Sequence, residues 1–145
     1  MGKSISLEIL LQSENICVCD ILKAFIDVGW MTMCEEGYTT YLQLEDKDMF
    51  DWVTEKKSIS SLMEICLKKE LSGEIVGVML HLQNTNTGMT FLLHEPCKIS
   101  LVPEKNQIYL GDDNLHLDYN WYIENVMRKI WSRFPILMYR FSWVW

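Results

Sequence analysis

The sequence predicts one α+β domain over residues 1–145, in which a central, largely antiparallel sheet is packed by about three helices. Apolar residues alternate with polar ones near both ends of the chain, which is typical of half-buried strands. A hairpin pattern occupies the middle, and three other segments repeat apolar residues at helical spacing. No linker or repeat divides the chain, and its length suffices for a core without disulfides or metals.

The N-terminal part begins with a strand over residues 4–12, in which Ile, Leu and polar residues alternate. A helix follows from the N-cap Asn15 to about Val28, and Gly29 supplies the residue that ends it. The polar positions of this helix form one narrow stripe, so we expect it to be covered on more than one side. A second strand is expected at residues 38–44.

A second helix begins at Ser58 or at Ser61, where a capping-box spacing occurs, and Gly73 ends it. A meander of short strands then covers about residues 75–110, in which Pro103 and the Lys105-Asn106 turn separate strands at 98–102 and 107–110. Its first hairpin turns at residues 84–88, where Asn, Thr and Gly gather. These strands form the centre of the predicted sheet.

The last helix begins with Asp118 as its N-cap, and its apolar residues recur at i, i+3, i+4 and i+7 up to residue 134. Trp121 falls on the opposite, polar face of this helix. A large aromatic residue there either packs under a neighbouring loop or anchors a partner. The chain ends in an aromatic strand over residues 136–145, which at a sheet edge could pair with a second copy or with a partner.

The balance of charge limits the partners. Twenty acidic residues against thirteen basic ones give a net charge of −7, which disfavours nucleic acid and favours a cationic protein. No apolar run approaches the roughly 18 residues of a membrane span, so no membrane partner is expected. Five cysteines without a Cys-x-x-Cys pair, and an N-terminus without a signal-peptide pattern, predict reduced thiols in a cytoplasmic protein.

The strongest candidate for chemistry is the segment His94-Glu95-Pro96-Cys97, because His and Cys bind zinc and His81 could lie nearby across the hairpin. Four well-spaced zinc ligands are not evident, and no glycine-rich phosphate loop occurs. We therefore expect no catalysis, no metal and no cofactor. A small hydrolase that uses His94 and Cys97, with or without a metal, is kept as the alternative.

A protein-binding surface is the remaining hypothesis. Two acidic segments, at residues 45–51 and 112–118, each run into aromatic residues. If both lie on one side, they make an acidic rim around aromatic anchors. The candidate partner-binding residues are Asp46, Asp48, Asp51, Trp52, Asp112, Asp113, Asp118 and Trp121. In the alternative interpretation, Phe50 and Trp52 are core residues of a short helix that Asp48 caps.

Several segments together resemble small bacterial immunity proteins of polymorphic-toxin systems, including those of contact-dependent growth inhibition. The resemblance covers about residues 46–125 and rests on Asp48-Met49-Phe50-Asp51-Trp52, Val78-Met79-Leu80-His81-Leu82, Thr85-Asn86-Thr87-Gly88, Phe91-Leu92 and Asp118-Tyr119-Asn120-Trp121-Tyr122. It implies a cytoplasmic protein without catalytic activity that binds one cognate toxin domain, often a cationic nuclease, and blocks its active site or its access to a target. A regulatory adaptor with another partner is a further alternative.

Overall fold

The computed structural model describes residues 4–12, 16–95, 97–105 and 118–144. The strands are β1 (Ser4–Leu11), β2 (Trp30–Met31), β3 (Thr39–Leu42), β4 (Trp52–Glu55), β5 (Val76–Leu82), β6 (Gly88–Glu95), β7 (Lys98–Lys105) and β8 (Ile136–Val144). The helices are α1 (Val18–Asp27), α2 (Ile59–Leu71) and a last helix made of α3 (Tyr119–Tyr122), the π-helical turn η1 (Ile123–Met127) and α4 (Arg128–Trp131).

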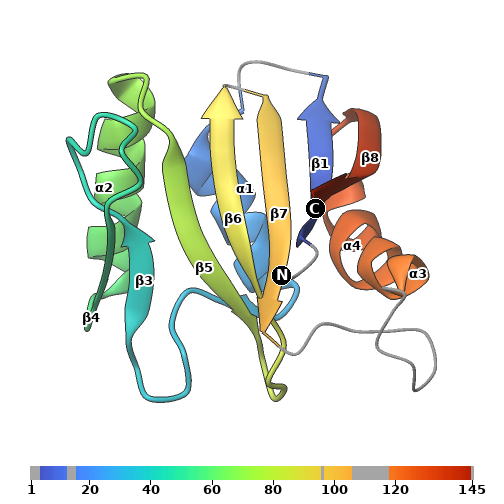
Figure 1. Cartoon of the computed structure of the whole chain (residues 1–145), viewed down its shortest axis with the longest axis horizontal. Coiled ribbons are helices and arrows are strands. Elements are labelled where there is room, and N and C mark those ends of the chain that lie inside the picture. Colours follow the sequence, from blue (N-terminus) through green and yellow to red (C-terminus); the bar gives the residue numbers. More distant parts are fainter. Residues whose placement is uncertain (1–3, 13–15, 96, 106–117, 145) are drawn as a thin grey trace.

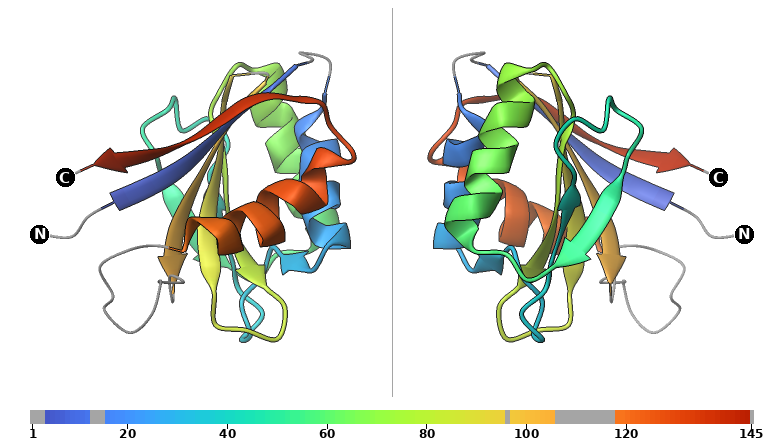
Figure 2. Two further views of the ribbon diagram at one scale, coloured as in Figure 1. Left: turned by 90° about the vertical axis from the view of Figure 1, so that its right-hand side faces the viewer. Right: turned by 90° about the vertical axis from the view of Figure 1, so that its left-hand side faces the viewer.

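The predicted α+β class and the antiparallel sheet are confirmed. The strands form one sheet in the order β4-β3-β5-β6-β7-β1-β8, in which every pairing is antiparallel, and the two-residue β2 pairs with β5 off this path. β4 and β8 therefore lie at its two ends (Figure 1). The helices gather on one face of the twisted sheet (Figure 2). None of the helices in the described ranges is long and apolar enough to cross a membrane.

The core lies between the helices and the sheet. Alternate residues of the central strands point into it, which the period of two in a strand requires. They are joined by the apolar stripes of the three helices. The cluster includes the large side chains of Trp30, Tyr122, Phe25 and Phe91, all almost completely buried, and the rings of Phe25 and Phe91 meet edge to face at 5.9 Å.

The helix boundaries follow local signals, with one correction. Ser58 is the N-cap of α2, because its side chain accepts a hydrogen bond from the Ser61 N–H, so the capping box at Ser61 was wrong. Gly29 and Gly73 end α1 and α2 with φ of +105° and +74°, as predicted. The N-cap of α1 is Cys17, and the expected cap Asn15 lies outside the described residues.

Two strands differ from the sequence prediction. Residues 52–55 form edge strand β4, so the alternative of a short helix around Phe50 and Trp52 was wrong. Strand β7 continues through Pro103, which pairs with Met89 next to a register shift, and the expected strand at 107–110 lies outside the described residues. Tertiary pairing overrides the local preference in both places.

The face of the sheet away from the helices carries a close contact near β4. Leu42 and Trp52 are cross-strand partners, and both cover the backbone of β5 at Gly77. A Cβ at Gly77 would lie 2.7 Å from Leu42 Cδ1 and 2.9 Å from Trp52 Cη2. Only glycine allows this approach, so Trp52 is held against the sheet although 37% of its surface remains exposed.

Candidate functional site

The hairpin loop between β3 and β4, residues 43–52, presents apolar side chains to solvent. Met49 is 78% exposed and Phe50 is 45% exposed, and Trp52 begins the strand that follows. The exposed acidic residues Glu45, Asp48 and Asp51 lie in the same segment. Apolar anchors with carboxylates around them are typical of a surface that receives a basic protein.

The backbone of this loop is strained. Four of its residues that are not glycine have positive φ: Glu45 at +62°, Lys47 at +54°, Asp48 at +58° and Phe50 at +54°. This left-handed conformation costs an L-residue roughly 1–2 kcal/mol. It persists only where surrounding contacts hold the chain, and such strain concentrates at functional sites.

A buried lysine of α2 holds the loop. The Lys69 ammonium donates to Asp46 Oδ1 at 2.8 Å, to the Gln43 carbonyl at 2.7 Å and to Glu74 Oε1 at 3.0 Å. Its side chain is 1% exposed and that of Asp46 is 0% exposed. An ammonium group has three donors, so all of them are satisfied inside the protein. Lys69 therefore fixes the loop to α2 through hydrogen bonds from its buried ammonium group.

The carboxylates around Lys69 also bind the strained backbone. Asp46 accepts hydrogen bonds from the backbone N–H groups of Asp48 at 3.2 Å and Asp51 at 3.3 Å. Glu74 accepts from the Glu45 N–H at 3.1 Å, and Asp48 accepts from the Ile75 N–H at 2.8 Å. The loop is therefore fixed both to α2 and to the segment that leads into β5.

Asp46 does not belong to an exposed acidic rim, so that part of the prediction was wrong. Its carboxylate points inward because it neutralises Lys69. Burial by itself raises the pKa of Asp46, but the hydrogen bonds from Lys69 and from the two backbone N–H groups outweigh burial, and the pKa lies below its usual value. Asp48 and Asp51 remain exposed beside Phe50.

The lowered pKa of Asp46 predicts a dependence of stability on pH. A carboxyl group whose pKa is depressed by folding stabilises the fold above its unfolded value, here 3.8, and loses this contribution as the pH falls through the folded value. We expect urea unfolding to show wild type more stable than Asp46→Asn at neutral pH, and the difference to shrink below pH 3.8. Asp20→Asn, at an exposed carboxylate of α1, is the control. A difference that is constant over this range would contradict the assignment.

The second predicted segment lies elsewhere. Asp118 is the N-cap of α3, as expected, because Oδ1 accepts from the Trp121 N–H at 3.1 Å. The adjoining Tyr119 contacts Phe141 of β8, with ring centroids 4.5 Å apart. The loop 43–52 belongs to the opposite edge, about 29 Å away along the sheet at usual strand spacing. Asp118 and Trp121 therefore do not share one surface with Trp52, and Asp112 and Asp113 lie outside the described residues.

Trp121 is half-buried against the core rather than standing on an open polar face. Its ring meets the buried Tyr122 edge to face, with centroids 4.9 Å apart and planes at 76°. Asp118 and Asn125 hold its backbone, since the Asn125 amide donates to the Trp121 carbonyl at 2.9 Å. The packing interpretation is thus favoured over the anchor interpretation.

The substitution Trp121→Ala tests whether Trp121 stabilises the fold by packing against the core. We expect the free energy of unfolding to fall by on the order of 2 kcal/mol, because the substitution removes contacts with the core. Urea unfolding measures the effect, and Trp131→Ala, at a tryptophan that is 49% exposed on the same helix, is the matched control. Equal stability of wild type and Trp121→Ala would restore the anchor interpretation.

The structure offers little support for a catalytic or metal site at His94. His81 pairs with Gly88, whereas Leu93 pairs with Val76 at the other end of the β5–β6 hairpin. His81 and His94 are therefore about 20 Å apart along the sheet, and the expectation that His81 lies near the motif was wrong. Among the described residues, no group of three His, Cys, Asp or Glu side chains could hold a metal ion. His94 and Cys97 are half-buried near the β6–β7 turn.

Two other thiols, those of Cys19 and Cys66, are unsuited to nucleophilic attack. Burial is the main cause that raises the pKa of Cys19 to about 11 and that of Cys66 to about 12. A thiol attacks as its thiolate, and these two groups stay protonated near neutral pH. They are packing residues between α1 and α2.

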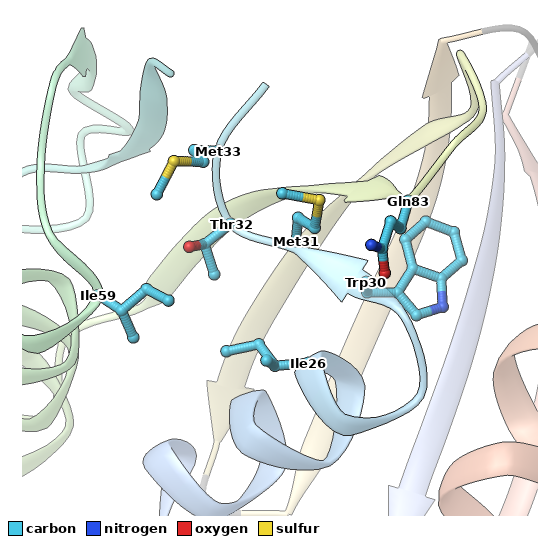
Figure 3. A pocket seen from close by; sticks show the side chains of 7 residues that line it. All are labelled: Ile26, Trp30, Met31, Thr32, Met33, Ile59 and Gln83. Atoms are coloured by element: carbon cyan, nitrogen blue, oxygen red, sulfur yellow. The ribbon is translucent and has the colours of Figure 1, made fainter. Parts of the chain in front are cut away.

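An apolar pocket of about 220 Å³ lies beside β2, between the end of α1 and the start of α2 (Figure 3). Ile26, Trp30 and Ile59 line it together with Met31 and Met33, and Thr32 and Gln83 add its polar groups. This volume is below the roughly 300–1,000 Å³ of usual small-molecule sites. The pocket contains no acidic, basic or thiol side chain, so its lining supports no catalytic chemistry.

Three comparisons with known proteins were negative: no family model, no curated protein and no solved structure matches the chain. The functional proposal therefore rests on the contacts, burial and charges of the residues described above. Sequence reasoning missed Lys69, although a signal existed: it stands at the i+7 position from Leu62, on the stripe that also contains Cys66. A lysine on the buried stripe of a helix requires an internal carboxylate.

Proposed function

We propose that the protein binds a cognate protein toxin domain and neutralises it, as an immunity protein does in the cytoplasm of the cell that makes it. The main support for this proposal is the structure of the loop 43–52. It is fixed by a buried ion pair, strained in its backbone, and yet exposes Met49 and Phe50. Preorganised anchors lose little entropy on binding, which is the property required of a tight inhibitor.

The chemistry of the loop favours a cationic partner. The exposed residues Glu45, Asp48 and Asp51 belong to the same loop as the apolar anchors, and the whole chain carries a net charge of −7. Electrostatic attraction speeds the encounter, whereas buried aromatic contacts slow dissociation. Neutralisation is by occlusion: an interface of roughly 1,200–2,000 Å² covers the active site of the toxin or its access to the target. The resemblance to immunity proteins includes residues 48–52 of this loop.

A hydrolase that uses His94 and Cys97 is the second candidate. Metal analysis of protein purified without added zinc separates the two: stoichiometric zinc that is lost in Cys97→Ser would favour the enzyme. A regulatory adaptor differs from an immunity protein only in its partner. Its gene would not adjoin that of a secreted toxin.

Charge reversal at Asp51 tests the proposed function. The Asp51 backbone contributes to the loop, whereas its side chain is exposed, so Asp51→Lys keeps the ties to Asp46. We expect slower association with the toxin domain recovered from the native cells, and the difference from wild type should shrink as salt is raised. Asp20→Lys makes the same charge change on α1. Equal association rates for the two variants would contradict a binding role for the acidic loop.

A further inference from the structure

The last strand, β8, is a long edge strand. It pairs with β1 from Ser4 opposite Val144 to Leu11 opposite Ile136, with one register shift between Leu10 and Leu11. Within the described ranges, no strand pairs with its other edge. The backbone groups on such an edge form a ready template for another strand. The left view of Figure 2 shows β8 on the outside of the sheet, next to β1.

β8 lacks several of the features that protect sheet edges, although it carries one charged residue, Arg140, and one register shift against β1. Proteins usually shorten edge strands or place lysine or proline on them. The opposite edge, β4, has only four residues and leads into Lys56 and Lys57. β8 has nine residues, with no lysine or proline, and it exposes Leu137 (60%), Met138 (50%) and Tyr139 (41%).

The arginines on and near β8 are paired with carboxylates of the same chain. Arg140, the only charged residue of the strand, donates a hydrogen bond through Nε to Glu8 Oε2 at 2.8 Å, and its Nη2 lies 2.8 Å from the same oxygen in an ion pair. On the neighbouring elements, Arg133 pairs with Asp27, and Arg128 pairs with Glu124 on the last helix. The exposed carboxylates of the loop 43–52 lie at the other end of the sheet (Figure 1). A cationic partner is therefore drawn to that end, whereas β8 is a neutral, apolar edge.

We propose that β8 pairs antiparallel with β8 of a second copy of the chain. The contact is isologous, because a two-fold axis presents the same edge from both copies. It covers Leu137, Met138 and Tyr139 and continues one sheet through the dimer. It also places the two acidic loops at the far ends, where like charges are well separated and each loop remains open to a partner. The dimer does not depend on the proposed function.

Light scattering during gel filtration, over a wide range of concentration, tests the dimer. Wild type should approach twice the monomer mass of 17.1 kDa as concentration rises. The double variant Leu137→Lys/Met138→Lys should stay at 17.1 kDa, because it adds two positive charges per copy to the shared edge, close to Arg140. Met49→Lys/Leu71→Lys is the matched control, since it replaces two exposed apolar residues far from β8 and should still dimerise.

Hydrogen exchange of wild type gives an independent readout that needs no substitution. Amide exchange over residues 136–144 should slow as the protein concentration rises, while exchange in the loop 43–52 should not change. A wild type that stays monomeric, or a dimer that persists in Leu137→Lys/Met138→Lys, would overturn the proposal. So would protection that appears elsewhere in place of β8. None of these results bears on toxin binding by the loop.

Discussion

Lys69→Met should lower the free energy of unfolding by about 3–5 kcal/mol, which is the usual cost of removing one partner from a buried ion pair. The substitution leaves the Asp46 carboxylate buried, with its side chain 0% exposed and without its cation. It also removes the hydrogen bonds to Gln43 and Glu74 that hold the strained loop. Urea unfolding measures the loss.

Two further variants show whether the loss of stability comes from the buried hydrogen bonds and ion pairs of Lys69. Lys68→Met changes the adjacent lysine, which is 56% exposed and pairs only along the helix with Glu64, so it should change stability by less than about 1 kcal/mol. Lys69→Met combined with Asp46→Asn removes both charges and should recover part of the loss. If Lys69→Met were as stable as Lys68→Met, the network would not hold the loop.

Phe50→Gly should weaken the binding of the toxin domain by at least about tenfold while leaving the fold intact. Phe50 has a φ of +54°, so glycine relieves strain there and offsets the entropy that it adds to the unfolded chain. We therefore expect the free energy of unfolding to stay within about 1 kcal/mol of wild type. Calorimetric titration of the partner and urea unfolding of the variant give the two readouts.

Lys47→Gly is the matched control, because Lys47 lies in the same loop with the same φ of +54° but carries no aromatic ring. It should preserve stability and should not weaken binding, because it removes a positive charge from a surface that receives a cationic partner. Weakened binding in Lys47→Gly alone would mean that backbone strain, rather than the ring of Phe50, determines affinity. Unchanged binding in both variants would remove Phe50 from the interface.

The elements that could be predicted are those with strong local signals. Alternation identified β1, Gly73 marked the end of α2, and the turn at 84–88 located the β5–β6 hairpin. These signals depend on residues close together in the sequence, where turn geometry and side-chain period decide the structure.

The candidate site could be predicted only in part, because its geometry depends on residues far apart in the chain. The acidic and aromatic composition of the loop was visible, but its left-handed backbone is maintained by Lys69, more than twenty residues away. A helical wheel placed Trp121 on the polar face because it considers one helix alone, whereas the packing around this residue is tertiary. The distance between the two acidic segments required the strand order.

Co-purification from the native cells tests the central claim most directly, with wild type and Phe50→Gly compared in parallel and the retained proteins identified by mass spectrometry. We expect wild type to retain one basic protein domain at one-to-one stoichiometry, this domain to be inactive until released, and Phe50→Gly to lose it. Equal retention by both chains, or a retained domain that is fully active while bound, would contradict neutralisation through the loop 43–52.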